Sequence, residues 1–363
     1  MFIINRIVFF FNSIAIFALL ISYLAPYISP EFLWYPAFLG LAYPALLILN
    51  ILFIVYWLIF FNMKFLFSLA AIVIGFNYIP KYVQFNDKKA SDNKPGTELQ
   101  VVTFNARYFG QLDEFSSQET ELFLDKLSRL NPDILCAQEY HVPSLDASQK
   151  LLAEVMNYFK KYEAANGMKR NEVLKTENVI IYSKHPIIQS GLVERENGSG
   201  NFTVYADIVK TGDTVRVINT HLQSIGFASR EYKAIRAIMG DEDSLSFSEL
   251  RNVGSKMKYA YMLRAKQVDA ITDFISKSPY PVILCGDFND SPVSYAYRTL
   301  KGDLNDAFME AASGLGRTYI GKAPSLRIDY ILYDKKLQAY DYYAKGFDFS
   351  DHKMVSCKLK IIH

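Results

Sequence analysis

The sequence contains few cysteines and, over its first 80 residues, almost no charge. Three cysteines among 363 residues are a small and odd number, which excludes a fold held together by disulfides. The 39 basic and 37 acidic residues nearly cancel, which excludes a protein bound to nucleic acid mainly by bulk charge. Internal repeats are absent, and the hydrophobic content of 51% excludes a disordered or collagen-like chain.

The lack of charge is confined to the N-terminal part. Before position 81 the only charged residues are Arg6, Glu31 and Lys64. They leave uncharged stretches of 24, 32 and 16 residues at 7–30, 32–63 and 65–80. A helix needs about 20 apolar residues to cross a bilayer, so we expect about three transmembrane helices in residues 1–80. A cleaved signal peptide is the alternative for the first stretch, but no small-residue cleavage pattern follows it.

A polar segment separates this region from a second domain. Residues 81–98 contain Pro95-Gly96 and show no periodicity, so we interpret them as a linker to a domain formed by residues 99–363. Apolar runs predict strands at 99–105, 133–139, 178–184, 202–209, 214–222, 281–289, 327–334 and 352–361. Helical spacing predicts helices at 117–130 and 255–277. Short buried strands with few helices indicate two packed sheets covered by helices.

Polar side chains stand at the ends of several of these strands. They are Asn105, Glu139, His221, Asp287, Asn289, Asp351 and His352. Taken singly, such a residue is as well explained by a solvated strand end, a turn or a satisfied core histidine. Buried carboxylates and imidazoles are costly without partners, so the set as a whole is expected to converge on one sheet edge. Carboxylate and amide oxygens suit Mg²⁺, and a histidine oriented by Asp329 can move a proton.

These residues lie in short motifs that occur in a particular order. TFNAR, AQEY, NTHL, GDFN, RIDYIL and SDH follow one another along the chain, and the arrangement resembles the endonuclease/exonuclease/phosphatase family, which includes DNase I-like nucleases. The resemblance covers about residues 99–363. It implies an α/β fold, a four-layer αββα sandwich, preceded here by the transmembrane helices. It also implies hydrolysis of phosphodiester bonds with Mg²⁺, Mn²⁺ or a similar divalent ion.

The resemblance also implies roles for individual residues. Asn105, Glu139 and Asp351 would bind the metal, while Asp287 and Asn289 would orient the water and the scissile phosphate. His221 would donate to a phosphate oxygen, and His352, held by Asp329, would complete an acid/base pair or stabilise the transition state. Which group accepts the proton from water stays open.

The substrate class stays open between nucleic acid and phospholipid. The sequence has no WTDR-like segment of the kind that marks inositol phosphatases, and His221 stands where abasic-site endonucleases of the family tend to carry Asn. After position 80 the 37 basic and 36 acidic residues leave a net charge of +1, which attracts nucleic acid weakly. Residues 223–258 form an insertion of interleaved basic and aromatic residues that fits a nucleic-acid backbone, a lipid head group or a solvated lid.

The sequence therefore predicts a membrane-anchored, metal-dependent phosphodiesterase. The alternative is a membrane-tethered scaffold that kept the fold and lost the chemistry. The expected partners are the lipid bilayer and a phosphodiester substrate, and nothing in the sequence indicates an obligate protein partner. Three spans would make the protein a multi-pass membrane protein with its termini on opposite sides. With Arg6 inside, the positive-inside rule places the catalytic domain outside the cytoplasm.

Overall fold

The structure is a computed structural model of the whole chain. It describes residues 2–86, 98–108, 117–140, 157–158, 162–165, 178–195, 201–227, 231, 233, 237, 246–321 and 326–362. Most of the predicted linker, residues 87–97, lies outside the described residues, and so do residues 228–230 and 238–245 of the predicted insertion.

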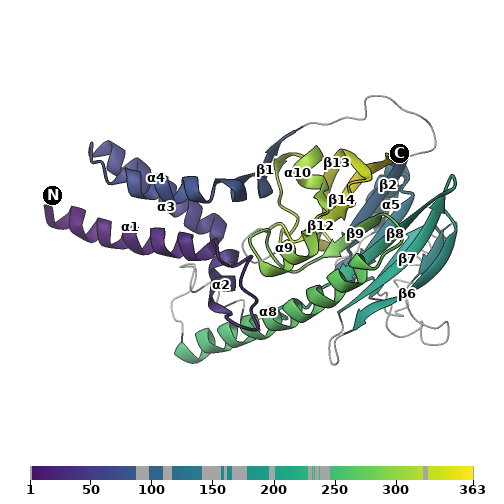
Figure 1. Ribbon diagram of the computed structural model, residues 1–363, viewed down its shortest axis with the longest axis horizontal. Coiled ribbons are helices and arrows are strands. Elements are labelled where there is room, and N and C mark those ends of the chain that lie inside the picture. The colour runs from purple at the N-terminus through teal and green to yellow at the C-terminus, as the bar shows by residue number, and fades with distance from the viewer. Residues whose placement is uncertain are drawn as a thin grey trace.

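Two six-stranded sheets form the centre of the part of the chain after residue 97 (Figure 1). The first contains, in spatial order, β13 (Leu337–Phe347), β14 (Ser350–Ile361), β2 (Glu98–Asn105), β3 (Ile134–Gln138), β5 (Val179–Ser183) and β4 (Glu163–Ala165). The second contains β10 (Asn305–Asp306), β12 (Asp329–Tyr333), β9 (Val282–Asp287), β8 (Asp213–His221), β7 (Phe202–Lys210) and β6 (Ile187–Arg195). Each sheet is antiparallel except for one parallel pair, which is β2 with β3 in the first and β8 with β9 in the second.

Helices cover the outer faces of both sheets. Helix α5 (Ser117–Leu130) buries Phe123 and Leu127 against the first sheet. Helices α8 (Phe247–Ser276) and α9 (Tyr295–Lys301) lie on the second sheet, where Val268 and Tyr297 are buried. A third apolar cluster fills the space between the sheets, because most strands of the two sheets bury alternate side chains there. The predicted four-layer αββα sandwich is therefore confirmed.

The N-terminal part forms shorter helices than predicted. It contains α1 (Phe2–Ser22), α2 (Tyr35–Leu41), α3 (Tyr43–Ile59), α4 (Phe65–Ile74) and the 3₁₀ helix η1 (Phe76–Lys81). Among the described residues, only α1 is long and apolar enough to cross a bilayer alone. Helices α2 and α3 reach that length together but are bent by 67° at their junction, and α4 has 10 residues. The prediction of three helices of spanning length is therefore wrong.

Proline and glycine residues explain the shorter helices. Pro36 and Pro44 lie in the first turns of α2 and α3, where proline is tolerated, so that each begins a separate helix. Helix α4 ends at Gly75, where an added Cβ would lie 2.1 Å from Cζ of Tyr23. The length of an uncharged stretch does not depend on such breaks, so it overestimates the lengths of the helices.

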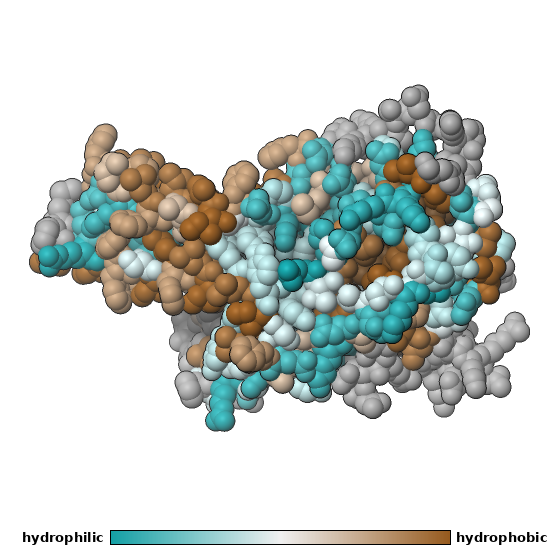
Figure 2. Space-filling model, viewed as in Figure 1, coloured by the Kyte–Doolittle hydropathy of each residue, from teal (hydrophilic) through white to brown (hydrophobic). Residues whose placement is uncertain are grey.

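The N-terminal helices place apolar side chains outside and polar side chains inside. Their exposed residues include Ile7, Phe10, Phe17, Ile48, Leu52, Ile59, Phe67 and Val73, which form the brown surface at the left of Figure 2. Three polar residues are fully buried between the helices, where Asn12 Nδ2 donates to Ser68 Oγ (2.7 Å) and Ser68 Oγ donates to Asn50 Oδ1 (3.0 Å). Hydrogen-bonded polar side chains between helices with apolar exteriors are typical of helices in lipid.

The N-terminal helices are also docked on the sandwich. Beyond η1, β1 (Val83–Phe85) pairs antiparallel with β11 (Ser313–Leu315), which follows α10 (Ala307–Ala311). Arg327 Nη1 donates to the carbonyl of Lys81 (2.9 Å), and Gly316 N donates to that of Tyr82 (2.8 Å). The first six residues of the predicted linker are therefore part of a folded contact. The division into 1–80, 81–98 and 99–363 otherwise stays a prediction.

We predict that Gly40→Ala destabilises this contact. An added Cβ on Gly40 of α2 would lie 2.3 Å from the carbonyl oxygen of Val293 and 2.6 Å from Cβ of Ala25, so that α2 or the loop after β9 has to move. Overpacking of this kind costs about 1–3 kcal/mol. The thermal unfolding temperature of the full chain in detergent, followed by tryptophan fluorescence, should fall.

The matched control is Gly254→Ala in α8, where an added Cβ meets nothing within 4 Å. Replacing glycine by alanine in a helix interior should stabilise that variant by about 1 kcal/mol. If both variants unfold at or above the temperature of the parent chain, the close contact at Gly40 is not present in the protein.

Candidate active site

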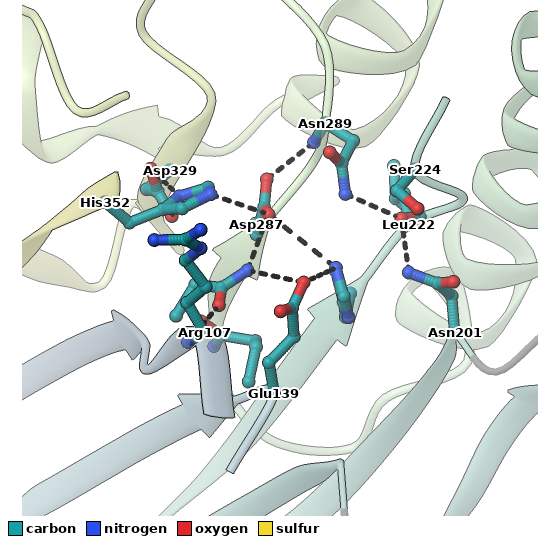
Figure 3. A network of polar contacts seen from close by, with 12 residues as sticks. Arg107, Glu139, Asn201, Leu222, Ser224, Asp287, Asn289, Asp329 and His352 are labelled. Carbon is teal, nitrogen blue, oxygen red and sulfur yellow. Dashed lines mark hydrogen bonds and ion pairs between the residues drawn. The ribbon is translucent and has the colours of Figure 1, made fainter. Parts of the chain in front are cut away.

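The polar residues that were predicted at strand ends lie together at one end of the sandwich (Figure 3). Asn105, His221 and Asp287 are the last residues of β2, β8 and β9, and Glu139 directly follows β3. Because β2 and β3 are parallel, as are β8 and β9, the carboxyl ends of each pair meet at one edge. Asp329, Asp351 and His352 come from the first residues of β12 and β14, which run antiparallel to β9 and β2.

Asp287 is the centre of the arrangement. Its side chain is almost completely buried, and its Oδ2 accepts a hydrogen bond from Asn105 Nδ2 (3.0 Å), while its Oδ1 accepts one from the backbone N–H of Asn289 (2.8 Å). The nearest ring nitrogens of His221 and His352 each lie 3.7 Å from Oδ2. Burial raises the pKa of Asp287 to about 6, against the opposing effect of both histidines.

Gly286 allows Asp287 to lie this close to β8. Its φ is +136°, and an added Cβ would lie 1.9 Å from the carbonyl oxygen of Thr220. No side chain fits there, so glycine is required for the close approach of the two strands.

His352 forms a pair with Asp329. Its Nδ1 lies 3.1 Å from both carboxylate oxygens of Asp329, and both side chains are buried. Burial alone would lower the pKa of His352, but the negative charges of Asp329 and Asp287 outweigh it and raise the pKa to about 10. The ring is therefore protonated at neutral pH.

Glu139 lies on the more open side of the site. Its Oε1 is 3.3 Å from Asn105 Nδ2 and 3.6 Å from Nε2 of His221. Burial raises its pKa, although its side chain keeps 21% of its exposure. Its φ is +47°, and Asn289 also has a positive φ of +51°. Left-handed backbone at non-glycine residues is uncommon and concentrates at functional sites, where the surrounding contacts hold it in place.

His221 and Asn289 face the same space from the second sheet. His221 is fully buried, and neither of its ring nitrogens has a hydrogen-bond partner among the described residues. Burial lowers its pKa, so the ring is neutral. Asn289 Nδ2 donates to the carbonyl of Leu222 (2.9 Å), to which Asn201 Nδ2 also donates (3.0 Å). The two amides therefore hold the segment that follows His221.

Two groups of residues in the site have oxygen or nitrogen atoms that can bind a metal. In the described part of the chain, ligand atoms of Asp287, Asp329 and His352 lie within 4.8 Å of one another. Both of these carboxylates are only 1% exposed, however, which leaves little room for the waters that Mg²⁺ retains. Glu139 and Asp351 have side chains that are 21% and 25% exposed, so they suit a hydrated divalent ion better.

The side-chain oxygen of Asn105, the third predicted metal ligand, is not directed at the metal site. Its Oδ1 accepts the backbone N–H of Arg107 (2.9 Å), and its amide nitrogen points at Glu139 and Asp287. In this orientation Asn105 holds the two carboxylates together rather than presenting an oxygen to an ion. Its role as a metal ligand stays a prediction.

Comparison with known families identifies the domain. A model of the Endonuclease/Exonuclease/phosphatase family matches residues 102–352. The chain belongs to this family. It is accordingly a metal-dependent phosphodiester hydrolase, as predicted. A second model, described as Domain of unknown function (DUF8431), matches residues 5–82, a range that contains α2, α3, α4, η1 and most of α1. No curated protein matches the chain.

Three solved structures are among those to which the chain is similar. TDP2 from D. rerio in complex with a single-strand DNA product has 15% sequence identity and a TM-score of 0.50, over 73% of this chain and 99% of that one. The endonuclease/exonuclease/phosphatase from Bacteroides vulgatus has 18% identity and a TM-score of 0.48, over 73% and 99%. Beta toxin from Staphylococcus aureus with bound magnesium ions has 20% identity and a TM-score of 0.45, over 72% and 99%.

The sequence did not indicate several supporting residues. Arg107, with a φ of +45°, places its Nε 3.8 Å from Asp351, and it directly follows the quoted Asn105-Ala106. Thr318 Oγ1 accepts the backbone N–H groups of Ile328 and Asp329 (3.0 Å each). Neither stands at a strand end, so the strand-end pattern could not find them. The positive charge of Arg107 at the end of TFNAR is the one feature of the sequence that could have indicated its place in the site.

We predict that Asp329→Asn changes the pH dependence of turnover. The negative charge of Asp329 raises the pKa of His352, so its removal lowers that pKa, by about 1–3 units for a neighbouring charge. If catalysis needs His352 protonated, the alkaline limb of the pH–rate profile should move to lower pH by that amount. The control is Asp303→Asn, whose side chain is fully exposed. An alkaline limb that does not move contradicts the pairing.

Proposed function

We propose that the site hydrolyses a phosphodiester with Asp287 as general base. A divalent ion, Mg²⁺ or Mn²⁺ or a similar ion, held by Glu139 and Asp351, would supply charge stabilisation at a phosphoryl oxygen. The observation that supports the proposal most is the position of Asp287, which lies buried among Asn105, His221 and His352. Burial raises its pKa toward the operating pH, where a general base works best. Asn289 N and Asn105 Nδ2 fix the orientation of its carboxylate.

The two histidines take different roles in this proposal. His352, protonated and held by Asp329, donates to a phosphate oxygen and stabilises the charge that develops there. His221 is neutral and has unpartnered ring nitrogens, so it can donate an N–H to a second phosphate oxygen without changing its charge. An inactive scaffold has no use for so many buried ionisable groups, which are costly unless they perform chemistry.

The full chain, purified in detergent, should hydrolyse bis(p-nitrophenyl) phosphate in the presence of Mg²⁺ or Mn²⁺, and EDTA should abolish turnover. Asp287→Asn should lower kcat by at least about 10²-fold, as expected for a positioned base. Asp303→Asn, at a fully exposed side chain, is the matched control and should retain activity. A metal-independent activity, or none with an intact fold, would sink the proposal.

Glu139→Ala and His352→Ala should separate metal binding from acid/base chemistry. Loss of Glu139 weakens the hold on the ion, so excess Mg²⁺ should restore part of the turnover. Loss of His352 removes a proton and a positive charge that extra metal does not replace. Full rescue of His352→Ala by metal would move His352 into the set of metal ligands.

We also propose that the N-terminal helices attach the enzyme to a membrane. The support is the apolar exterior of α1, α3 and α4 around a buried polar cluster. In Figure 1 the N-terminus and the sandwich lie at opposite ends of α1. Lys64, between α3 and α4, places its Nζ 4.5 Å from the ring centroid of Phe9, so it lies toward the end of α1 that carries Arg6. Two cations at that end favour a cytoplasmic N-terminus and a catalytic domain outside the cytoplasm.

A reporter fused after residue 363 tests this topology. In a bacterial host, alkaline phosphatase should be active there, while green fluorescent protein should not fluoresce when exported by the same route. The protein should stay in the membrane fraction after an alkaline carbonate wash. A reporter that is active only in the cytoplasm contradicts the topology, and release by carbonate contradicts membrane insertion.

A further inference from the structure

We propose that the substrate is a phosphodiester carried by a lipid at the bilayer surface. This inference rests on the phosphodiesterase activity and the membrane attachment proposed above. It follows from where the catalytic residues lie relative to the N-terminal helices, since these helices contact the loops on both sides of the site.

The loop after β9 makes the first attachment. Ser291, two positions after Asn289, donates through Oγ to the carbonyl of Gly40 in α2 (3.4 Å), and Lys81 Nζ donates to the carbonyl of Pro292 (3.3 Å). Val293 is buried in one apolar cluster with residues of α1, α3 and α4. Two residues of extended chain cover at most about 7 Å. Asn289 therefore lies within about that distance of Ser291, which contacts α2.

The segment before β12 makes the second attachment. Arg327, two positions before Asp329, donates to the carbonyl of Lys81 (2.9 Å). Gly316 donates to the carbonyl of Tyr82 (2.8 Å), and three residues further Tyr319 lies with its ring centroid 5.3 Å from that of His352. The strands that supply buried carboxylates to the site are β9, with Asp287, and β12, with Asp329. The loop after β9 and the segment before β12 therefore both contact the N-terminal unit, near α2 and the end of η1.

The contact region has the composition of a membrane–water interface. Trp34 and Tyr35 lie side by side at the start of α2, and Phe32 is 87% exposed. Lys258 of α8 lies over the Trp34 ring at 5.3 Å. Aromatic side chains collect at the head-group level of membranes, and lysines near that level attract anionic lipids. Figure 2 shows the brown surface of the N-terminal helices giving way to the teal surface of the sandwich in this region.

A lipid phosphodiester suits this placement better than a nucleic acid. In the proposed attachment the head groups lie at the level of α2, and Ser291, two positions after Asn289, contacts α2 there. The net charge of +1 after residue 80 gives no long-range attraction for a polyanion. In the reaction, the oxygen of a water bonds to phosphorus and the bond from phosphorus to one ester oxygen breaks. One proton of that water passes to Asp287, and the leaving oxygen takes a proton from solvent.

The experiment uses the full chain reconstituted into vesicles of phosphatidylcholine and phosphatidylglycerol with Mg²⁺. Three rates are compared, namely release of water-soluble phosphate or head group from the vesicles, cleavage of single-stranded DNA, and hydrolysis of bis(p-nitrophenyl) phosphate. We expect lipid turnover with a kcat/KM at least about tenfold above that for DNA, since attachment to the same surface raises the effective concentration of the lipid.

A charge reversal tests the role of the interface. Lys258→Glu, at the membrane-facing contact, should lower the ratio of lipid to bis(p-nitrophenyl) phosphate turnover about fivefold or more, because it removes a cation and adds an anion near the head groups. Lys277→Glu, an exposed lysine just beyond the other end of α8, is the matched control and should leave that ratio unchanged.

The outcomes separate the two proposals. Hydrolysis of bis(p-nitrophenyl) phosphate without lipid turnover, or with DNA as the better substrate, overturns the lipid inference and leaves the phosphodiesterase function standing. Absence of turnover on all three probes overturns the proposed function and the inference with it. If Lys258→Glu and Lys277→Glu lower the ratio of lipid to bis(p-nitrophenyl) phosphate turnover equally, the contact of Lys258 with Trp34 is not what favours the lipid substrate.

Discussion

The buried carboxylate of Asp287 is the constraint on which the site depends. A carboxylate that is 1% exposed is costly unless donors surround it, and here the donors come from separate parts of the chain. Asn105 comes from the first sheet, Asn289 from the loop after β9, and the two histidines from β8 and β14. The two sheets can satisfy Asp287 only when their edges meet in register. Burial at this convergence raises the pKa of Asp287 toward the range of a general base, while the histidines and the Asn289 N–H oppose that rise.

The sandwich and most of the site were predictable because strand periodicity and strand ends are local features of sequence. Helix 117–130 has the predicted limits, and strands such as 281–289 end at the expected catalytic residues. Helix α8 begins at Phe247, eight residues before the predicted start, because Ser246 and Glu249 form a capping box that the apolar periodicity does not reflect. The amide orientation of Asn105 was not predictable, since it depends on Arg107 and on two carboxylates from other strands.

The N-terminal part shows where sequence reasoning failed, and the reason is physical. Uncharged length was read as helix length, but Pro36, Pro44 and Gly75 divide that length into short helices. Short helices remain compatible with lipid only if their exposed backbone ends and polar side chains find partners inside the bundle. Asn50 meets this requirement by donating to the carbonyl groups of Ala15 and Leu46. Pro36, Pro44 and Gly75 thus divide the chain into short helices, and the hydrogen-bonded polar side chains of Asn12, Asn50 and Ser68 lie buried between these helices.

The described chain contains the apolar cores of the sandwich and a separate apolar core among the N-terminal helices. The second core includes one residue of the sandwich, Val293. The three clusters of the sandwich contain no residue before Leu99, so the apolar cores of the two sheets are built from residues of the sandwich itself. The fourth cluster joins Leu19, Tyr23, Tyr43 and Ala71 to Val293, which lies four residues after Asn289. The apolar cores of the sandwich are therefore separate from the core of the N-terminal unit, whereas the loop behind Asp287 and Asn289 packs against that unit. A change in the N-terminal unit can reach the site along two short segments, from Val293 to Asn289 and from Arg327 to Asp329.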